Sequence, residues 1–199
     1  IPVRVKMVGR QAELYEEMRR TLQVELRHAP DGAAFRVKAK ELMPHMTRLL
    51  QLAGHPGMLG DYIEDKDLAK FDVLDELLAE AGDQKVLLWD HHPAVLDRLA
   101  ARYPEWNPVV IHGKVAERAS EAAKKRFRED PECRMACVST LAMSEGQNLQ
   151  AGSVAIFHSL PWHYEKIIQA CGRIDRIGQT RPPTLYFLIA ENTLEEHVF

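Results

Sequence analysis

The fold class follows from one short run, Lys85-Val86-Leu87-Leu88-Trp89, which is apolar after its first residue. A continuous apolar run of this length is typical of a strand that is covered on both faces of a sheet. Directly before it, residues 66–81 repeat leucine and phenylalanine at helical spacing, so we expect an amphipathic helix that leads into the strand. A helix followed by such a strand favours an α/β fold.

Further apolar runs and helical stretches alternate after residue 89. The sequence predicts strands at 86–89, 108–111, 134–138, 154–157 and 184–189, and helices at 94–102, 116–128 and 164–177. This alternation implies a parallel sheet with helices on both faces. Ligands of such sheets lie at the carboxyl ends of the strands, where we expect the loops at 112–114, 139–140 and 159–162.

The first sixty residues have a different character. Apolar residues recur every four positions between 11 and 27 and predict a helix, and a second helical run ends near residue 52, with Pro44 starting or kinking it. We therefore expect a helical extension at 1–60 and an α/β domain at 61–199. A capping box at 193–196 opens a helix that the sequence does not finish, so we expect a longer parent protein.

Composition excludes several classes of protein. Of the 199 residues, 46% are hydrophobic and 28% are charged, and the formal net charge is −3. This charge excludes a globally basic nucleic-acid binder but not a local basic groove. No apolar run is long enough to span a membrane, and three cysteines without a signal-peptide pattern favour an intracellular location. Cys133 and Cys137 lack the partners of a zinc site, so we expect no metal centre.

One predicted helix near the end of the chain presents charge in an ordered way. In the stretch from 169 to 179 (QACGRIDRIGQ), Gln169, Arg173 and Arg176 stand at helical spacing on one stripe, opposite Ile167 and an apolar stripe. Two guanidiniums on one stripe favour a phosphate between them. The spacing is equally compatible with a solvated helix face in which Asp175 is a local ion partner.

Taken together, the motifs resemble the second motor lobe of Swi/Snf-type DNA translocases in helicase superfamily two. The matching blocks follow one another in the family's order: 49–59, which ends a helix in His-Pro; Lys70; 85–90, similar to motif IV; 112–118 with 126–127; 139–149, similar to motif V; and 169–182, similar to motif VI, with a tail at 184–196. Any one block is a common pattern, whereas six in order are specific to the family.

The resemblance implies a RecA-like lobe that completes an ATP site on another lobe. Arg173 and Arg176 then act as arginine fingers, which contribute about a thousandfold or more in rate. Gln169 senses the γ-phosphate or orients the attacking water. Gly146 and Asn148 line the nucleotide side of motif V, although Gly146 and Gly152 can also be read as residues that bracket a turn.

The resemblance also implies contacts with double-stranded DNA. Ser139 and Thr140 donate to backbone phosphates, and His112, Lys114 and Arg118 extend this track. Trp162 lies against the sugar-phosphate backbone or in the minor groove in this reading. The alternative is a half-buried tryptophan that anchors its loop.

The basic run at 124–128 is not included among the predicted DNA contacts. Acidic residues follow it at once, at 129, 130 and 132, so we expect a solvated helix face around Phe127 rather than a DNA contact.

Two motor motifs are missing from this sequence. There is no phosphate-binding G-x-x-x-x-G-K-[ST] loop and no Asp-Glu-x-His box, so ATP and Mg²⁺ are expected to bind mainly to a first lobe, the N-terminal partner of this one. The isolated chain is therefore expected to be inactive. Residues 90–92 (DHH) are interpreted as the end of motif IV rather than as a metal site.

Several residues depart from the common family pattern. His112 stands where an acidic residue is usual, residues 144–145 (SE) replace a glycine pair, residues 163–164 (HY) replace Asn-Pro, and Asp175 replaces a histidine. These departures suggest a bacterial, archaeal or phage branch.

Three hypotheses of different class follow. The first is the second lobe of an ATP-dependent DNA translocase, the second is a catalytically silent interaction module with the same fold, and the third is a free-standing α/β enzyme that acts on a small phosphorylated substrate. The third lacks an evident nucleophile and base.

Overall fold

A computed structural model describes residues 1–28, 33–59, 68–141, 149–162, 164–174 and 182–199, without the side chains of 33–39, 58, 164 and 173. The chain divides into two compact units. We call the first the sheet unit, made of residues 1–3, 74–189 and 198–199. The second is the helical unit, made of residues 4–73 and 190–197.

A six-stranded sheet carries the predicted α/β fold. Its strands are β1 (Pro2–Val5), β2 (Val86–Asp90), β3 (Val109–Ile111), β4 (Met135–Ser139), β5 (Val154–Phe157) and β6 (Thr184–Ala190). Their order is β1-β6-β5-β2-β4-β3, and the pairs β2–β4, β2–β5, β3–β4 and β5–β6 are parallel. The five predicted strands are confirmed within about one residue, while β1 was not expected.

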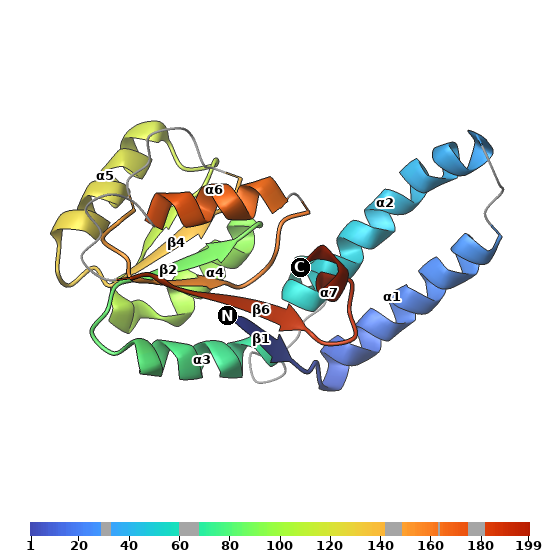
Figure 1. Ribbon diagram of the computed structural model, residues 1–199, viewed down its shortest axis with the longest axis horizontal. Helices are drawn as coiled ribbons and strands as arrows, with labels where there is room; N and C mark the ends of the chain where they lie inside the picture. Colours follow the sequence, from blue (N-terminus) through green and yellow to red (C-terminus); the bar gives the residue numbers. More distant parts are fainter. Residues whose placement is uncertain (29–32, 60–67, 142–148, 163, 175–181) are drawn as a thin grey trace. The chain divides into compact units, whose positions relative to one another are not determined.

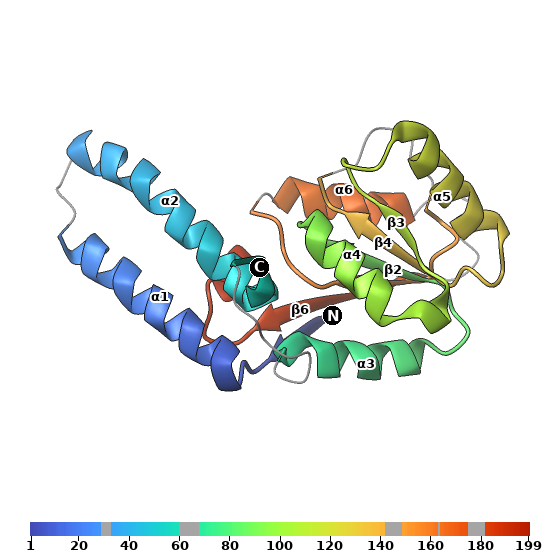
Figure 2. The same cartoon turned by 180° about the vertical axis from the view of Figure 1, so that it is seen from behind.

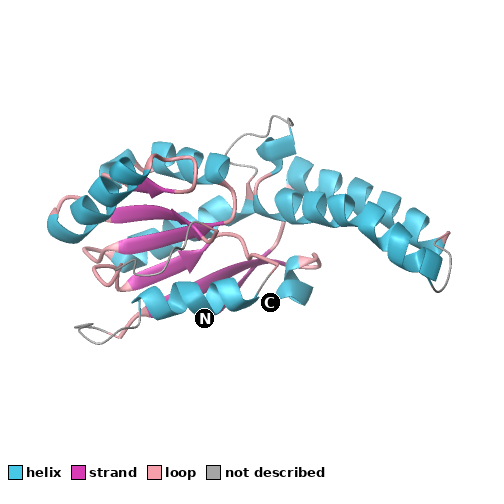
Figure 3. Ribbon diagram, turned by 90° about the horizontal axis from the view of Figure 1, so that it is seen from above, coloured by secondary structure: helices cyan, strands magenta, loops and turns pink. Residues whose placement is uncertain are grey.

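Helices cover both faces of the sheet (Figure 1; Figure 3). On one face, α5 (Glu117–Glu129) and α6 (Tyr164–Ile174) pack on the side chains of alternate strand residues, among them Leu87, Trp89 and Phe157. The opposite face carries α4 (Pro93–Arg102), which is in front of the strands in Figure 2. Helix α3 (Ala69–Ala81) precedes β2 in the chain. A short η3 (Pro104–Trp106) follows α4. Burial on both faces explains why β2, β4 and β5 read as continuous apolar runs.

The helical unit is built on an antiparallel pair, α1 (Gly9–Arg27) and α2 (Ala33–Gly54), followed by η1 (Pro56–Leu59) (Figure 1). Its core joins residues of α1 and α2 to Ala190 and Leu194, at the start of the tail that ends in α7 (Glu195–Val198). The Tyr15 hydroxyl accepts the N–H of Leu194 at 2.7 Å, so the tail is bound to α1.

Of the two alternatives for Pro44, the structure excludes a helix start, because Pro44 lies inside α2, on an exposed side. Proline removes one intrahelical hydrogen bond there, and the buried leucines on either side hold the helix together through packing. The boundary expected after residue 60 falls in the undescribed range 60–67, and the packing of residues 190–197 with α1 and α2 was not indicated by the sequence.

None of the helices in the described ranges is both long and apolar enough to cross a membrane.

Candidate nucleotide and nucleic-acid site

Parallel pairing gathers the ends of four strands at one edge of the sheet. Asp90 ends β2 and lies opposite Ser139, which ends β4. His112 follows β3 and His158 follows β5 on the same edge. This carboxyl edge is where open α/β sheets bind ligands, and it carries most of the predicted DNA-binding residues.

Asp90 is the centre of a buried hydrogen-bond network at this edge. Its Oδ2 accepts from Nδ1 of His158 at 2.8 Å, and its Oδ1 accepts from the backbone N–H of His92 at 2.7 Å. Both Asp90 and His158 are almost completely buried. Burial by itself raises the pKa of a carboxyl, but the imidazoles of His158 and His92, the second with its Nδ1 3.5 Å from Asp90 Oδ1, outweigh it and hold the pKa of Asp90 far below its ordinary value. Asp90 is therefore an ionised carboxylate beneath the edge.

Ser139 and Thr140 lie below the surface. Both are buried, the Ser139 hydroxyl oxygen accepts the N–H of Leu141 at 3.2 Å, and the N–H of Thr140 donates to the carbonyl of Asp90 at 3.0 Å. The Thr140 hydroxyl has no hydrogen-bond partner among the described residues. Because their hydroxyls are covered, these two residues shape the start of the motif V loop in this structure and do not present donors at its surface.

His112 is likewise engaged inside the fold. Its Nδ1 accepts the N–H of Lys114 at 3.3 Å, so Nε2 carries the proton that faces Asp97 Oδ1 at 3.2 Å. The ring is 7% exposed. His112 thus holds the loop of Lys114 through its ring, while Lys114 and Arg118 are exposed and free to meet a phosphate backbone.

Trp162 stands at the end of a tightly held connection. Ser159, Leu160 and Pro161 are buried, and Trp162 itself is half-buried. This intermediate exposure accommodates both readings made from the sequence, an anchor for its loop and an aromatic face available to DNA.

Helix α6 has the two-sided character that the sequence predicts. Ile167, Ala170 and Ile174 are buried in the core, and Cys171 packs against it half-buried. Gln169 is exposed. Arg173 lies in the last turn of the described helix, but its side chain, together with Arg176, Gly146 and Asn148, lies outside the described residues.

Gly152 has a packing role rather than a turn role alone. A Cβ at this position would lie 2.8 Å from Cγ of Leu87, closer than real contacts allow. The sequence suggested only a bracket around a turn. The structure shows that the backbone of Gly152 lies directly against the central strand.

The basic run on α5 is a solvated helix face at Lys125, Arg126 and Arg128, whereas Lys124 is buried, which the sequence did not indicate. Phe127 is buried, while the cationic side chains around it pair with acidic neighbours: Lys124 with Glu121, Lys125 with Glu129, Arg126 with Asp130, and Arg128 with Glu129. These pairs neutralise the run locally, so it is not a basic patch.

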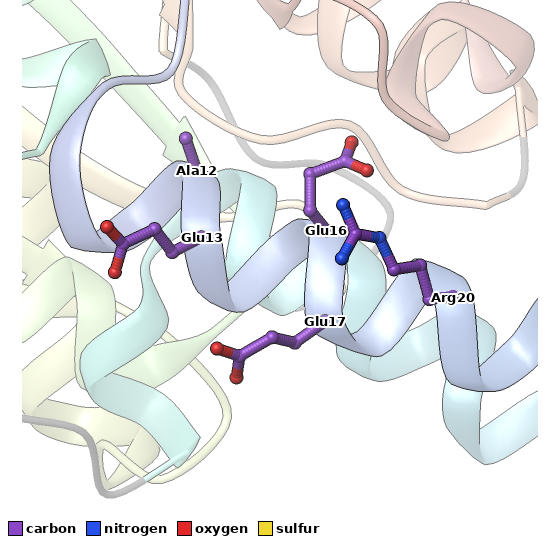
Figure 4. A pocket seen from close by; sticks show the side chains of 5 residues that line it. All are labelled: Ala12, Glu13, Glu16, Glu17 and Arg20. Carbon is purple, nitrogen blue, oxygen red and sulfur yellow. The ribbon is translucent and has the colours of Figure 1, made fainter.

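A shallow groove of about 380 Å³ lies along α1 of the helical unit, lined by Ala12, Glu13, Glu16, Glu17 and Arg20 (Figure 4). Its carboxylates already have partners, because Arg10 pairs with Glu13 and Glu17, and Arg19 pairs with Glu16. The groove is therefore a helix surface on which arginines of α1 already pair with the acidic side chains. In the described residues, no group of three or more His, Cys, Asp and Glu side chains is arranged to hold a metal ion.

Sequence reasoning missed the pairing of Asp90 with His158. Each is a charged or polar residue directly after an apolar strand run, VLLW and VAIF, and that position was the available signal. Which two strand ends are neighbours depends on the strand order, in which β5 lies beside β2.

Comparison with known protein families shows to which family this chain belongs. The model of the helicase conserved C-terminal domain matches residues 69–178, more than half of the chain. The chain belongs to this family of helicase C-terminal domains.

Individual relatives narrow the resemblance. The human lymphoid-specific helicase is 32% identical over 133 residues, which are 65% of this chain and 16% of that protein. The chromatin-remodeling ATPase INO80 of Cryptococcus neoformans is 32% identical over 138 residues, 66% of this chain and 8% of that protein. The chain thus spans less than a fifth of the length of these relatives.

The fold matches that of a solved SWI2/SNF2 ATPase core. The Sulfolobus solfataricus SWI2/SNF2 ATPase core in complex with double-stranded DNA superposes with a TM-score of 0.81 at 21% identity, covering 100% of this chain and 42% of that one. The predicted RecA-like parallel sheet of a SWI2/SNF2-type second lobe is confirmed at the level of fold.

Proposed function

We propose that this chain is the second motor lobe of an ATP-dependent double-stranded DNA translocase. The observation that carries the proposal is helix α6, which buries Ile167, Ala170 and Ile174 in the core and exposes Gln169, four residues before Arg173. A helix anchored in this way presents a fixed polar face to a neighbouring lobe. Membership of the helicase C-terminal family supports this role.

ATP and Mg²⁺ bind mainly to the first lobe in this proposal. Arg173 and Arg176 meet the negative charge that develops on the transferred phosphoryl group, and Gln169 senses the γ-phosphate or orients the attacking water. Gly146 and Asn148 line the nucleotide side of the motif V loop. The chain alone does not hydrolyse ATP, because these groups complete a site that the other lobe begins.

DNA contact is made by the loops at the carboxyl edge. Lys114 and Arg118 are exposed and bind phosphates directly, and Trp162 adds an aromatic contact. His112, Ser139 and Thr140 lie beneath these groups and hold the loops that carry the contact. A related SWI2/SNF2 core has been solved with double-stranded DNA, which supports a duplex as the substrate.

We expect an intracellular location, because the proposed substrate is DNA.

The expected bacterial, archaeal or phage branch receives no support from the sequence relatives given above, which are human and fungal. The proposal is therefore not restricted to one branch.

The test is the ATPase activity of the full-length protein, measured with duplex DNA, single strands, RNA and no nucleic acid. Arg173→Ala and Arg176→Ala should each lower kcat by about a thousandfold or more and change KM for ATP little, since the fingers act in the transition state. Arg128→Ala removes an exposed arginine paired with Glu129 and is the matched control.

DNA-stimulated turnover near the wild-type rate in both finger variants would overturn the finger assignment. A full-length protein that binds DNA but shows no turnover under any of these conditions would favour the silent interaction module.

A further inference from the structure

We propose that Asp90 and His158 are positioning residues that fix residues 139–141 after β4 and the connection from His158 to Trp162 after β5, and so couple DNA contact to ATP hydrolysis. The inference rests on the proposed function, because it assigns a role within the same motor. It starts from the bond between Asp90 Oδ2 and His158 Nδ1, which joins residues 68 positions apart in sequence across the ends of β2 and β5.

The first arm of the pair reaches the motif V loop. Asp90 lies opposite Ser139, and its carbonyl accepts the N–H of Thr140 at 3.0 Å, the first residue after β4. The Ser139 hydroxyl then accepts the N–H of Leu141. Thr140 is therefore held to the end of β2, and Leu141 is held to the end of β4.

The second arm reaches Trp162. The N–H of His158 donates to the carbonyl of Trp89 at 2.8 Å, and the Ser159 hydroxyl accepts the N–H of His91 at 3.3 Å. From there the chain passes through buried Leu160 to Trp162. A short buried connection has little freedom, so a shift of the His158 ring moves the start of this loop.

The charge on Asp90 gives the pair its strength. An ionised carboxylate accepts charge-assisted hydrogen bonds, and here it also lies at the N-terminus of α4, where His92 donates its N–H. Asparagine at position 90 would keep the shape and the acceptor for His92. Its NH₂ group would face His158 Nδ1, which then has to accept instead of donate. The substitution therefore weakens the tie between the loops without emptying the site.

The experiment compares variants of the full-length protein by the ratio of DNA-stimulated to basal ATP turnover. Asp90→Asn should lower this ratio by about fivefold or more, the size of a typical coupling between two sites. The exchange variant D90H/H158D restores a charge-assisted bond between the two strand ends but loses the carboxylate that accepts from His92, so it should recover part of the ratio. A purely structural role would lower both rates in proportion to the folded fraction and leave the ratio unchanged.

Asp75→Asn is the matched control. Asp75 also accepts side-chain hydrogen bonds, from Tyr103 at 2.6 Å and Arg102 at 2.8 Å, but it belongs to α3 and its bonds lead to the end of α4 instead of to the residues after β4 or β5. Its ratio should equal that of the wild type. Thermal unfolding of every variant gives the folded fraction.

The outcomes are distinct. A ratio that is unchanged in Asp90→Asn, or an exchange variant that regains its melting temperature but no part of its ratio, overturns the inference. If Asp90→Asn does not fold, Ser159→Ala decides, because it removes only the acceptor for His91: a lowered ratio supports the inference and an unchanged one overturns it. A wild type without DNA-stimulated turnover overturns the proposed function, and the inference with it.

Discussion

Lys70 on α3 and Glu195 on α7 form a buried ion pair in the helical unit: Nζ lies 2.7 Å from Oε1, and each side chain is 1% exposed. The second carboxylate oxygen accepts the N–H of Ala190 at 2.8 Å. Gln11 lies in the same unit, where its side-chain NH₂ donates to the carbonyl of Leu52 and its side-chain oxygen accepts the N–H of Ala69. Buried polar side chains therefore join the start of α3, the tail and α1.

Lys70→Met should lower the free energy of unfolding by about 3–5 kcal/mol, because it leaves the charge of Glu195 buried without its cation. The double variant K70M/E195L should recover part of this loss, since no charge then remains. Denaturant unfolding measures both. Arg4→Ala is the control: its partner Glu196 is next to Glu195, but the pair is exposed, so a loss below about 1 kcal/mol is expected. Equal losses in the two single variants would contradict this account.

The stability supplied by Asp90 should depend on pH with a defined sign. Its pKa is lower in the folded protein than in the unfolded chain, so its contribution is complete above the unfolded value of about 3.9 and is lost as the pH falls from there toward the folded pKa. The difference in unfolding free energy between wild type and Asp90→Asn should be constant from pH 7 to about 5 and shrink below pH 4. Unfolding curves at each pH measure it, and a difference that persists unchanged to pH 3 would refute the assignment.

Two glycines should respond oppositely to alanine. Gly152→Ala places a methyl group on Leu87 and should destabilise the protein by roughly 1–3 kcal/mol. Gly172 lies inside α6 with open space around its Cα, so Gly172→Ala should stabilise by roughly 0.5–1 kcal/mol. Thermal melts compare the two. A stabilising Gly152→Ala would show that Leu87 can move aside.

Lys114 and Arg118 should account for part of the salt dependence of DNA binding. Lys114→Ala and Arg118→Ala should each weaken binding to duplexes of any sequence and reduce the slope of log K against log salt by about one. Lys125→Ala is the control. Lys125 belongs to the basic run of α5, and its Nζ already lies 3.8 Å from a carboxylate oxygen of Glu129. Fluorescence anisotropy at several salt concentrations provides the slopes, and an unchanged slope in the two variants removes these residues from the track.

The sequence predicts the central strands well but does not predict the outer strand β1. Strand β5 occurs at the predicted residues, because a strand buried on both faces is necessarily a continuous apolar run. Strand β1 is a four-residue edge strand, PVRV, with mostly accessible side chains, so its short alternation carries no comparable signal. Pro44 left two alternatives open, a helix start or a kink, and only the structure shows that it lies inside α2.

The candidate site was predictable where its pattern lies within one helix and not where it depends on neighbouring strands and loops. The buried and exposed sides of α6 follow from spacing alone, as Ile167 and Gln169 illustrate. The burial of His112, Ser139 and Thr140 depends on adjacent loops and strands, and so does the bond from Asp90 to His158. Periodicity describes one element at a time, whereas these contacts arise from strand order. The roles of Arg173 and Arg176 remain predictions.

The helical unit is discontinuous, since it combines residues 4–73 with residues 190–197, and this affects how the chain folds as it is made. Lys70 and Glu195 are separated by 125 positions. At roughly 5–20 residues per second, a ribosome needs on the order of 10 s to pass from one to the other. During that interval α1 and α2 have been synthesised without residues 190–197, so the sheet unit is made before the helical unit can be completed by the segment that bonds Tyr15.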